Sequence, residues 1–482
     1  MYEVYQEEIL AQVAEAEFMA VLGDETTDVE NHIQYVIVIR YVLPNGDVTE
    51  RFWGFFRPEG QDATTLADIT KKELHILLPN APEKLVAQGY DGASVMSGVH
   101  SGVQAQVRQE FVNAWYIHCR AHQFNLMAQK AASTIARPRK FFSSLNSIPV
   151  FFARSPQRLA ALDACVAKRV PSATPLRWNY LSRTVQMVYS NREVLKECFA
   201  KLSVNRKSTD ATVTQATALH IIMRDGEFQF WLEFFSRIMP HVDLFYAQLQ
   251  TKQTDATRVK RCTSNFINAV QKKRDEMAES PAEDALQPME KRRRIAVSQS
   301  RRHAAIGVLD CIIHTTKERF ETVDHLTASC LIDPTQFELF STQFPTKMLD
   351  TTATFFPQLK KAALKSELIL LYEKEEFRQA EGAVALLKFI ISEGLDCIFS
   401  ETVKLIKIVI TMPMSTAEAE RCFSTLKRIK TFLRNTMDQD RLNALAVLTI
   451  EKSLLLRMPN FNEKVIKKFA SKKDRRIPLF HK

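Results

Sequence analysis

Two aspartates, each at the end of a short apolar run, are the first residues in this chain that could do chemistry. Asp24 ends FMAVLGD (18–24), and Asp91 ends EKLVAQGYD (83–91). Two neighbouring carboxylates repel each other, and a divalent cation between them relieves the repulsion. Their oxygens suit Mg²⁺ or Mn²⁺, and two such ions can hold the attacking and leaving oxygens of a phosphoryl transfer. An aspartate at a strand end is also an ordinary turn residue, so neither position is decisive alone.

A third acidic position lies near the other end of the chain, in PMSTAEAERCFSTLKRIKTFLR (413–434). The segment is typical of a capped helix, with Ser415 or Thr416 as N-cap and Glu418 at a capping-box position. Glu420 follows in the same helix, where a solvated surface glutamate would be equally ordinary.

Five strand-like segments and the helices between them are expected to position the two aspartates. Strands are predicted over 18–24, 34–43, 48–56, 83–91 and 114–119, and helices over 64–78 (N-cap Thr64 or Thr65), over 102–112 and from 122 onward. A PNGD turn separates the second strand from the third, as in a hairpin. Three antiparallel strands followed by β–α alternation indicate a mixed sheet covered by helices, in the strand order of the ribonuclease-H-like fold. In that fold the first and fourth strands are neighbours, so Asp24 and Asp91 would meet at one edge of the sheet.

From about 140 to 410 the pattern becomes helical. The segments 176–202 and 227–250 are rich in aromatic residues, as expected where bulky side chains join packed helices. The polar, charged stretch 276–302 is predicted to be a mobile linker. Its KRRR cluster (291–294) could be a nuclear import signal, a phosphate contact or a solvated loop.

Composition sets broad limits on the function. At roughly 100–200 residues per domain, 482 residues allow two to four domains. Lys and Arg (65) exceed Asp and Glu (55) by 10, which permits a polyanionic partner without requiring one. The eight cysteines form no CxxC pair, which argues against a disulfide framework or a zinc ribbon and favours a reducing compartment. No apolar run is long enough to predict a membrane span.

Four blocks of the sequence resemble the hAT superfamily of DNA transposases (hobo, Activator, Tam), especially its zinc-finger-MYM-like or domesticated branch. They are GDETTD around Asp24, GYDGASVMSG around Asp91, IHCRAHQFNL (117–126) and the long C-terminal block 413–448. The resemblance implies an α/β, ribonuclease-H-like (retroviral-integrase-like) mixed sheet interrupted by a large all-α insertion domain. It also implies a metal-binding catalytic triad of Asp24, Asp91 and Glu420 that uses Mg²⁺ or Mn²⁺. Glu418 is the alternative third member.

The resemblance implies DNA-contacting residues as well. Arg177 and Trp178 are similar to the family's Arg-Trp motif, whose tryptophan stabilises distorted flanking DNA by stacking; the alternative for Trp178 is a core position. Cys119 and His122 would lie near the active site as support or as DNA contacts, since one Cys/His pair is two ligands short of a structural zinc site. Arg421, next to the proposed catalytic glutamate, is assigned to DNA too.

The C-terminal block resembles the hAT dimerisation region. Four residues at helical spacing are assigned to dimerisation: Leu442, Leu445, Ala446 and Thr449. Such a stripe can also pack in the core of its own chain.

These expectations divide the chain into a helical lead-in (1–17), the first part of the core (18–140), a helical insertion domain (141–410), the catalytic helix with the dimerisation region (411–456) and a basic tail (457–482). No Cys/His cluster precedes Asp24, so either the chain is a fragment or it has lost its sequence reader. Without such a reader, DNA binding would depend on backbone charge and fall steeply with salt.

Two functions follow. The first is a transposase core that cleaves and joins DNA, acts in the nucleus as a homodimer or higher homo-oligomer, and uses neither a membrane nor a small-molecule substrate. The alternative is a domesticated, catalytically inactive nuclear protein that works through dimerisation and through binding of DNA or protein.

Overall fold

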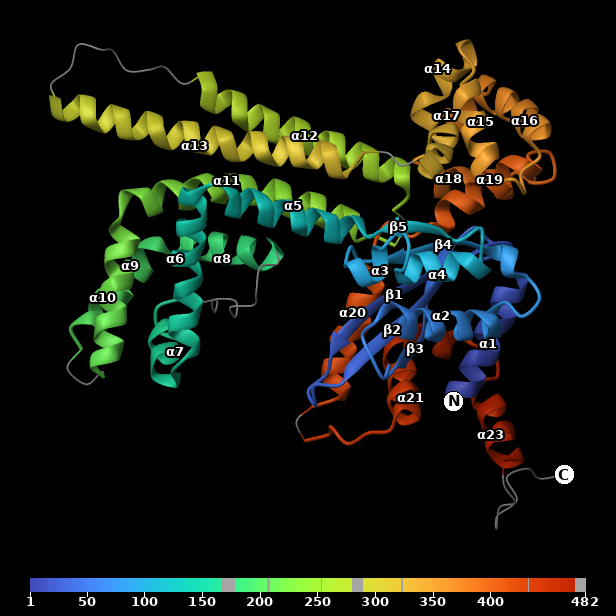
Figure 1. Cartoon of the computed structure of the whole chain (residues 1–482), viewed down its shortest axis with the longest axis horizontal. Helices are drawn as coiled ribbons and strands as arrows, with labels where there is room; N and C mark the ends of the chain where they lie inside the picture. Colours follow the sequence, from blue (N-terminus) through green and yellow to red (C-terminus); the bar gives the residue numbers. More distant parts are fainter. Residues whose placement is uncertain are drawn as a thin grey trace. The chain divides into compact units, whose positions relative to one another are not determined.

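A computed structural model describes residues 1–166, 178–205, 209–252, 254–279, 289–321, 324–431 and 433–472, with only the backbone for 128, 131–134, 178–179 and 289–298. The chain forms two compact units (Figure 1). The sheet unit consists of Met1–His122, Leu249–Lys260 and Thr322–Lys482, and the helical unit of Gln123–Gln248 and Arg261–Glu321.

The sheet unit is built around a mixed five-stranded sheet, as predicted. Its strands are β1 (Met19–Thr27), β2 (Ile33–Val42), β3 (Val48–Phe56), β4 (Leu85–Tyr90) and β5 (Trp115–His118). Their order is β3-β2-β1-β4-β5, with β1 antiparallel to β2 and parallel to β4. The β2–β3 hairpin closes at Gly46, whose φ of 82° is a left-handed conformation that glycine adopts at little cost.

Helices before and after the sheet complete this unit. Those near the strands in sequence are α1 (Tyr2–Glu15), α2 (Ala63–Leu77), η1 (Pro82–Lys84), α3 (Ser94–Ser97) and α4 (Val103–Glu110). Those of the C-terminal part are η2 (Asp324–Ile332), η3 (Pro334–Gln336), α14 (Phe337–Thr342), α15 (Thr346–Phe355), α16 (Lys361–Glu373), α17 (Glu375–Arg378), α18 (Ala383–Ser392), α19 (Ser400–Thr411), α20 (Ala417–Ile429), α21 (Gln439–Ile450), α22 (Lys452–Arg457) and α23 (Phe461–Ser471). The predicted cap of α2 is wrong: Asp62 is the N-cap, and its carboxylate accepts from the amide of Thr65.

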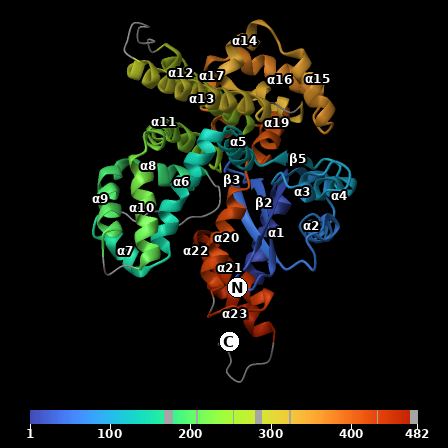
Figure 2. The ribbon, with the colours of Figure 1, turned by 60° about the vertical axis from the view of Figure 1, so that its left-hand side comes forward.

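The two faces of the sheet carry different helices. On one face the Tyr35 hydroxyl hydrogen-bonds Thr70 of α2 at 3.0 Å. On the other face, Phe423 of α20 stacks on Phe55, and α20 runs alongside β1 and β2 (Figures 1 and 2). Because Asp24 pairs with Val36, the neighbour of Tyr35, strand alternation puts Asp24 on the α20 face of the sheet.

Side chains cover the outer edge of β3. The Tyr5 hydroxyl donates to the Phe52 carbonyl at 2.6 Å, and the Phe52 amide donates to Glu451 at 2.9 Å. The Phe55 amide donates to the Asn443 side chain at 2.8 Å. These bonds use backbone groups through which an edge strand could otherwise pair with a strand of another chain.

The described part of the helical unit consists of helices. They are α5 (Arg120–Thr134, whose start belongs to the sheet unit), α6 (Ala136–Ala153), α7 (Pro156–Asp163), α8 (Trp178–Ser190), α9 (Arg192–Ser203), α10 (Asp210–Arg224), α11 (Gly226–Leu249), α12 (Ala256–Glu279) and α13 (Met289–Arg319). Aromatic rings fill its core: Phe235 packs on Phe142, with ring centroids 4.6 Å apart, and Phe245 stacks on Phe266 at 4.8 Å. None of the described helices combines the length and apolarity needed to cross a bilayer.

The prediction of a mobile linker over 276–302 is wrong at both ends of that range, because both ends are helical. Helix α12 continues to Glu279, and α13 begins at Met289; residues 280–288 lie outside the described part of the chain. Ion pairs accommodate the charge of these helices, since Lys273 pairs with Glu276 and Arg274 with Asp310 of α13. The many charged residues of this stretch therefore belong to solvent-exposed helices stabilised by ion pairs, and they do not indicate a linker.

Candidate carboxylate site

Asp24 and Asp91 lie at matching positions on neighbouring parallel strands. The last register pair of β1 and β4 is Leu22 with Gly89, and each aspartate follows its strand's member of that pair by two residues. Adjacent strands lie about 4.8 Å apart, so the two residues stand at the same edge of the sheet. Both are half-buried, which leaves them reachable from solvent.

Glu25 is an acidic neighbour that the sequence analysis missed. Its backbone amide donates to the Asp24 carboxylate at 2.9 Å. Burial, followed by the negative charge of Asp91, raises the pKa of the Glu25 carboxyl. One of its oxygens is buried and accepts no hydrogen bond within the described part of the chain. The sequence showed Glu25 only as the neighbour of Asp24 in GDETTD. The fold was needed to show that the charge of Asp91 raises the pKa of Glu25.

Helix α20 carries Glu420, and the segment leading into this helix is fixed against β4 and the end of β5. The Thr416 amide donates to the Cys119 sulfur at 3.2 Å, and the Arg120 amide donates to the Met414 carbonyl at 2.9 Å. Gly89 of β4 leaves room for Pro413: a Cβ at Gly89 would lie 2.8 Å from the Pro413 Cγ. The start of α20 is thereby tied to the strand that precedes Asp91.

The predicted capping box of α20 does not form. Thr416 occupies the N-cap position, but its side chain makes no cap hydrogen bond. The Glu418 carboxylate instead forms ion pairs with two cations: the Arg421 guanidinium at 2.6 Å and the Lys252 ammonium at 3.0 Å. Of the two predicted N-cap residues, Ser415 and Thr416, the structure gives Thr416, and the amide of Thr416 donates to the Cys119 sulfur.

Cys119 supports α20 and offers no surface to DNA. It is only 3% exposed. Burial raises the pKa of its thiol; the hydrogen bond from Thr416 opposes the rise, and the nearby charge of Glu420 adds to it. The side chain is therefore a neutral thiol near pH 7, which is a poor metal ligand. Of the two roles predicted for Cys119, the structure gives the supporting one.

The remaining residues assigned to DNA have different outcomes. His122 is half-buried, and its ring lies 6.3 Å from that of His118. Arg421 donates to Glu418 and to the Gln250 carbonyl, and 48% of its side chain is exposed, so its assignment to DNA stays a prediction. Arg177 lies outside the described residues, as does the side chain of Trp178, the first residue of α8.

A compact acidic group occurs elsewhere in the sheet unit. Among the described residues, Asp28, Glu30 and His32 form the one group of three whose ligand atoms all lie within 4.8 Å of one another. Lys430 already neutralises this group, with its ammonium 2.6 Å from Asp28 and 3.3 Å from Glu30. A buried lysine thus occupies the place that a cation would take there. Asp24, Asp91 and Glu420 do not meet this close spacing.

The residues predicted to mediate dimerisation separate into two groups. Leu442 and Ala446 are 1% and 0% exposed and belong to the core beneath the sheet, so their assignment to a subunit interface is corrected. Leu445 is half-buried and Thr449 is exposed. The periodicity predicted the helix, but it marked the face that packs in the same chain.

Comparison with known proteins agrees with this architecture. One family model, "ZMYM1/FAM200, RNase-like domain", matches residues 2–102, and another, "hAT family C-terminal dimerisation region", matches residues 372–454. Among curated proteins, the "52 kDa repressor of the inhibitor of the protein kinase" of Homo sapiens is 20% identical over 97% of this chain, and the Mus musculus protein of that name is equally similar. The chain spans 66% of the length of each, slightly less than two thirds. The chain thus matches an RNase-like domain model at one end and an hAT dimerisation-region model at the other, and the resemblance predicted from its sequence blocks is confirmed at this level.

Proposed function

We propose that this chain is the catalytic core of an hAT-type transposase, which cleaves and joins DNA with the help of divalent metal ions. The fold would be ribonuclease-H-like, interrupted by an all-α insertion domain. The helical unit, Gln123–Gln248 and Arg261–Glu321, would be this insertion in place of the predicted range 141–410, because Thr322–Lys482 belongs to the sheet unit. One observation carries the proposal: Asp24 and Asp91 follow the same register pair of two adjacent parallel strands. The helix with Glu420 packs on β1 of that pair.

The donor set fits a hard divalent cation. Asp24, Asp91 and Glu420 are half-buried carboxylates, and oxygen donors of this kind suit Mg²⁺ or Mn²⁺. When bound, such an ion would neutralise charge on the attacking and leaving oxygens of a phosphoryl transfer. The chain's own contribution is to orient Glu420, because the Cys119 thiol and the Arg120 amide fix the residues before α20.

The proposed substrate is DNA and the proposed location is the nucleus, where the protein would act as a homodimer or higher homo-oligomer. The dimerisation-region match supports self-association. The net charge of +10 permits a polyanionic partner. DNA binding that depends on the phosphate backbone should weaken steeply as salt rises.

Nicking of supercoiled plasmid DNA at low salt with Mn²⁺ tests the catalytic proposal. Wild type should nick and join the plasmid, and Asp91→Asn should lose on the order of 100-fold or more of this activity, because removing a metal ligand costs several kcal/mol of transition-state stabilisation. Asp396→Asn, at an exposed aspartate of the same unit, is the matched control and should retain activity. Equal rates for wild type and Asp91→Asn would refute the assignment.

A second candidate is a domesticated protein without catalysis. Among the described residues, Asp24, Asp91 and Glu420 do not form a group with all ligand atoms within 4.8 Å of one another, which favours this candidate, and the human relative is named a repressor. This candidate expects folded, self-associated protein that cleaves no DNA with Mg²⁺ or Mn²⁺. Sedimentation analysis of the plasmid-assay samples distinguishes this inactive, self-associated protein from an enzyme that is inactive because it is misfolded.

A further inference from the structure

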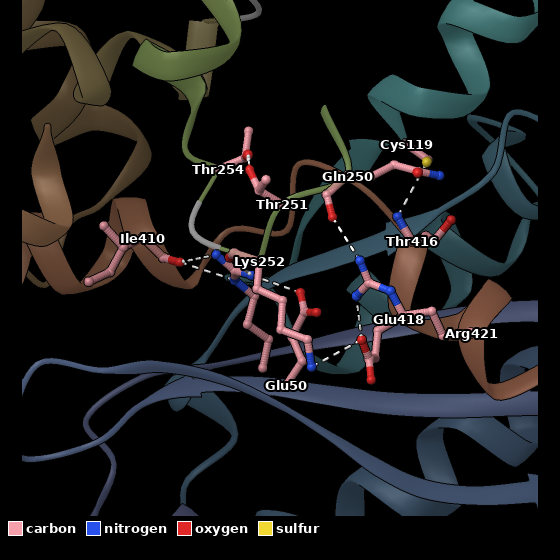
Figure 3. Close-up of polar contacts among 11 residues, drawn as sticks. Glu50, Cys119, Gln250, Thr251, Lys252, Thr254, Ile410, Thr416, Glu418 and Arg421 are labelled. Atoms are coloured by element: carbon pink, nitrogen blue, oxygen red, sulfur yellow. Dashed lines mark hydrogen bonds and ion pairs between the residues drawn. The ribbon is translucent and has the colours of Figure 1, made fainter. Parts of the chain in front are cut away.

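A short segment enters the sheet unit from the middle of the sequence. Leu249–Lys260 belongs to this unit, although the residues on both sides of it in sequence belong to the helical unit. Gln250, Thr251 and Lys252 follow the end of α11, and Figure 3 shows Gln250 and Lys252 in contact with Arg421 and Glu418 of α20. We call residues 250–252 the return segment.

Buried Arg40 of β2 fixes one side of the return segment. Its guanidinium donates to the Lys252 carbonyl at 2.8 Å and to the Glu50 carboxylate at 2.7 Å. It also donates twice to the Ile410 carbonyl in α19, at 3.1 and 2.8 Å. Arg40 and Glu50 are almost fully buried, so their charges are balanced within the fold and the contact is specific in geometry.

Helix α20 holds the other side of the return segment. Arg421 donates from one nitrogen to the Gln250 carbonyl at 3.0 Å and from another to Glu418 at 2.6 Å (Figure 3). The Lys252 ammonium lies 3.0 Å from the same oxygen of Glu418. Glu418 is nearly buried, with 9% of its side chain exposed, so it needs both cations as partners.

These contacts flank Glu420 along the helix. In sequence, Glu420 lies between Glu418 and Arg421, in the first turn of α20. Four residues earlier, the Thr416 amide donates to Cys119. A displacement of the return segment would therefore pull on the turn that carries Glu420, while the other end of that turn stays fixed by the thiol.

We propose that Lys252, Glu418 and Arg421 form a clamp that positions Glu420 at the carboxylate site. They are positioning residues, because their polar groups contact one another and the return segment. The inference rests on the proposed function and deepens it: the segment connecting two helices of the helical unit sets the place of the third carboxylate. It also gives Arg421 a role within the chain.

Hydrogen–deuterium exchange of the full chain tests the clamp without relying on catalysis. Lys252→Met and Arg421→Met should speed amide exchange in the first turns of α20 roughly tenfold or more, because local opening of that turn becomes easier. Lys252→Arg should restore slow exchange, whereas Arg421→Lys should restore it only in part, since lysine cannot donate in two fixed directions. Matched controls are Lys260→Met and Lys427→Met, at exposed lysines of α12 and α20. Wild-type exchange in both Lys252→Met and Arg421→Met would overturn the clamp.

Calorimetric titration with Mn²⁺ then separates the clamp from the proposed function. If the wild type binds Mn²⁺, both clamp variants should bind it roughly 10-fold more weakly, the size expected for residues that orient a metal ligand. The lysine controls should bind as the wild type does. Faster exchange with unchanged Mn²⁺ affinity would overturn the positioning role. Failure of the wild type to bind Mn²⁺ would refute the proposed function, and the exchange experiment would still decide whether the clamp holds α20.

Discussion

At the scale of single residues, small buried groups determine where the proposed catalytic helix begins. The Cys119 sulfur accepts from the Thr416 amide, and Gly89 leaves the space into which Pro413 fits. Neither residue offers a charge for catalysis. Each acts through the backbone that leads to Glu420, so its replacement should be measurable as a loss of stability.

Replacing Cys119 by alanine should lower the free energy of unfolding by about 1–3 kcal/mol, because the buried Thr416 amide loses its acceptor. Cys119→Ser should lose less, since a hydroxyl can still accept. Urea unfolding measures both, with Cys397→Ala at an exposed cysteine as the control. Equal stability of the two alanine variants would show that the thiol contact contributes nothing.

Replacing Gly89 by alanine should also destabilise the chain, by about 1–3 kcal/mol, the usual cost of overpacking. The added Cβ would lie 2.8 Å from the Pro413 Cγ, so the segment before α20 would have to move. Gly307→Ala is the contrast, because its nearest neighbour would be 3.6 Å away, an ordinary contact. Thermal unfolding compares the two variants. Similar midpoints would mean that Pro413 can move away from the added Cβ without loss of stability.

At the scale of elements, α20 is held at its far end as well. Lys430, just beyond its last residue, pairs with Asp28, and the two side chains are 4% and 1% exposed. Burial acts to raise the pKa of Asp28, but hydrogen bonds from Lys430 and from the amides of Glu30 and His32 outweigh it and lower the pKa below its ordinary value. The β1–β2 connection is thereby tied to the end of α20.

This pair predicts a pH dependence of stability. Because the pKa of Asp28 is lower in the folded chain, its stabilisation is complete above the unfolded pKa of about 3.9 and is lost as the pH falls through the folded value. Asp28→Asn should therefore be less stable than wild type at pH 7, with the difference shrinking below about pH 4. Lys430→Met should cost roughly 3–5 kcal/mol at pH 7, since it leaves a buried carboxylate unpaired. Denaturant titrations from pH 3 to 7 measure both; a constant difference between wild type and Asp28→Asn would contradict the assignment.

Elements were predictable from sequence where the signal is local. The β-branched run 34–43 and the turn at Gly46 give a strand and a hairpin by chemistry contained within a few residues. The role of Glu418 was not predictable, because its local pattern suits a capping box while its strongest partners include Lys252, far away in sequence. The same holds for Glu25, whose pKa depends on Asp91 of another strand. The predicted strand end holds for Asp91, which directly follows β4, but Asp24 lies inside β1, which continues past the predicted end at 24 to Thr27. The groups that tune and position the site required the fold.

At the scale of the whole molecule, the sheet unit is assembled from three separate stretches of chain, and its last stretch includes the dimerisation region. That region also completes the unit's own core, through Leu442 and Ala446, and covers the edge of β3 through Asn443. The proposed self-association would therefore use what this packing leaves outside. Leu448 of α21 lies within the matched region and is 37% exposed, and Leu456 of α22 lies two residues beyond it and is 76% exposed.

Placing a charge at these two leucines should weaken self-association without unfolding the chain. Leu448→Glu and Leu456→Glu should each raise the dimer dissociation constant about tenfold or more, equivalent to about 1.4 kcal/mol, because a carboxylate would be buried without a partner in an apolar contact. Leu339→Glu, at an exposed leucine of α14 outside the dimerisation match, should leave the constant unchanged. Leu442→Ala should instead lower monomer stability by about 2–5 kcal/mol, as a large-to-small change in a core does. Sedimentation equilibrium measures the association and urea unfolding the stability. Wild-type association in both glutamate variants would mean that subunits meet on another face, and the C-terminal helices would then serve the fold of a single chain.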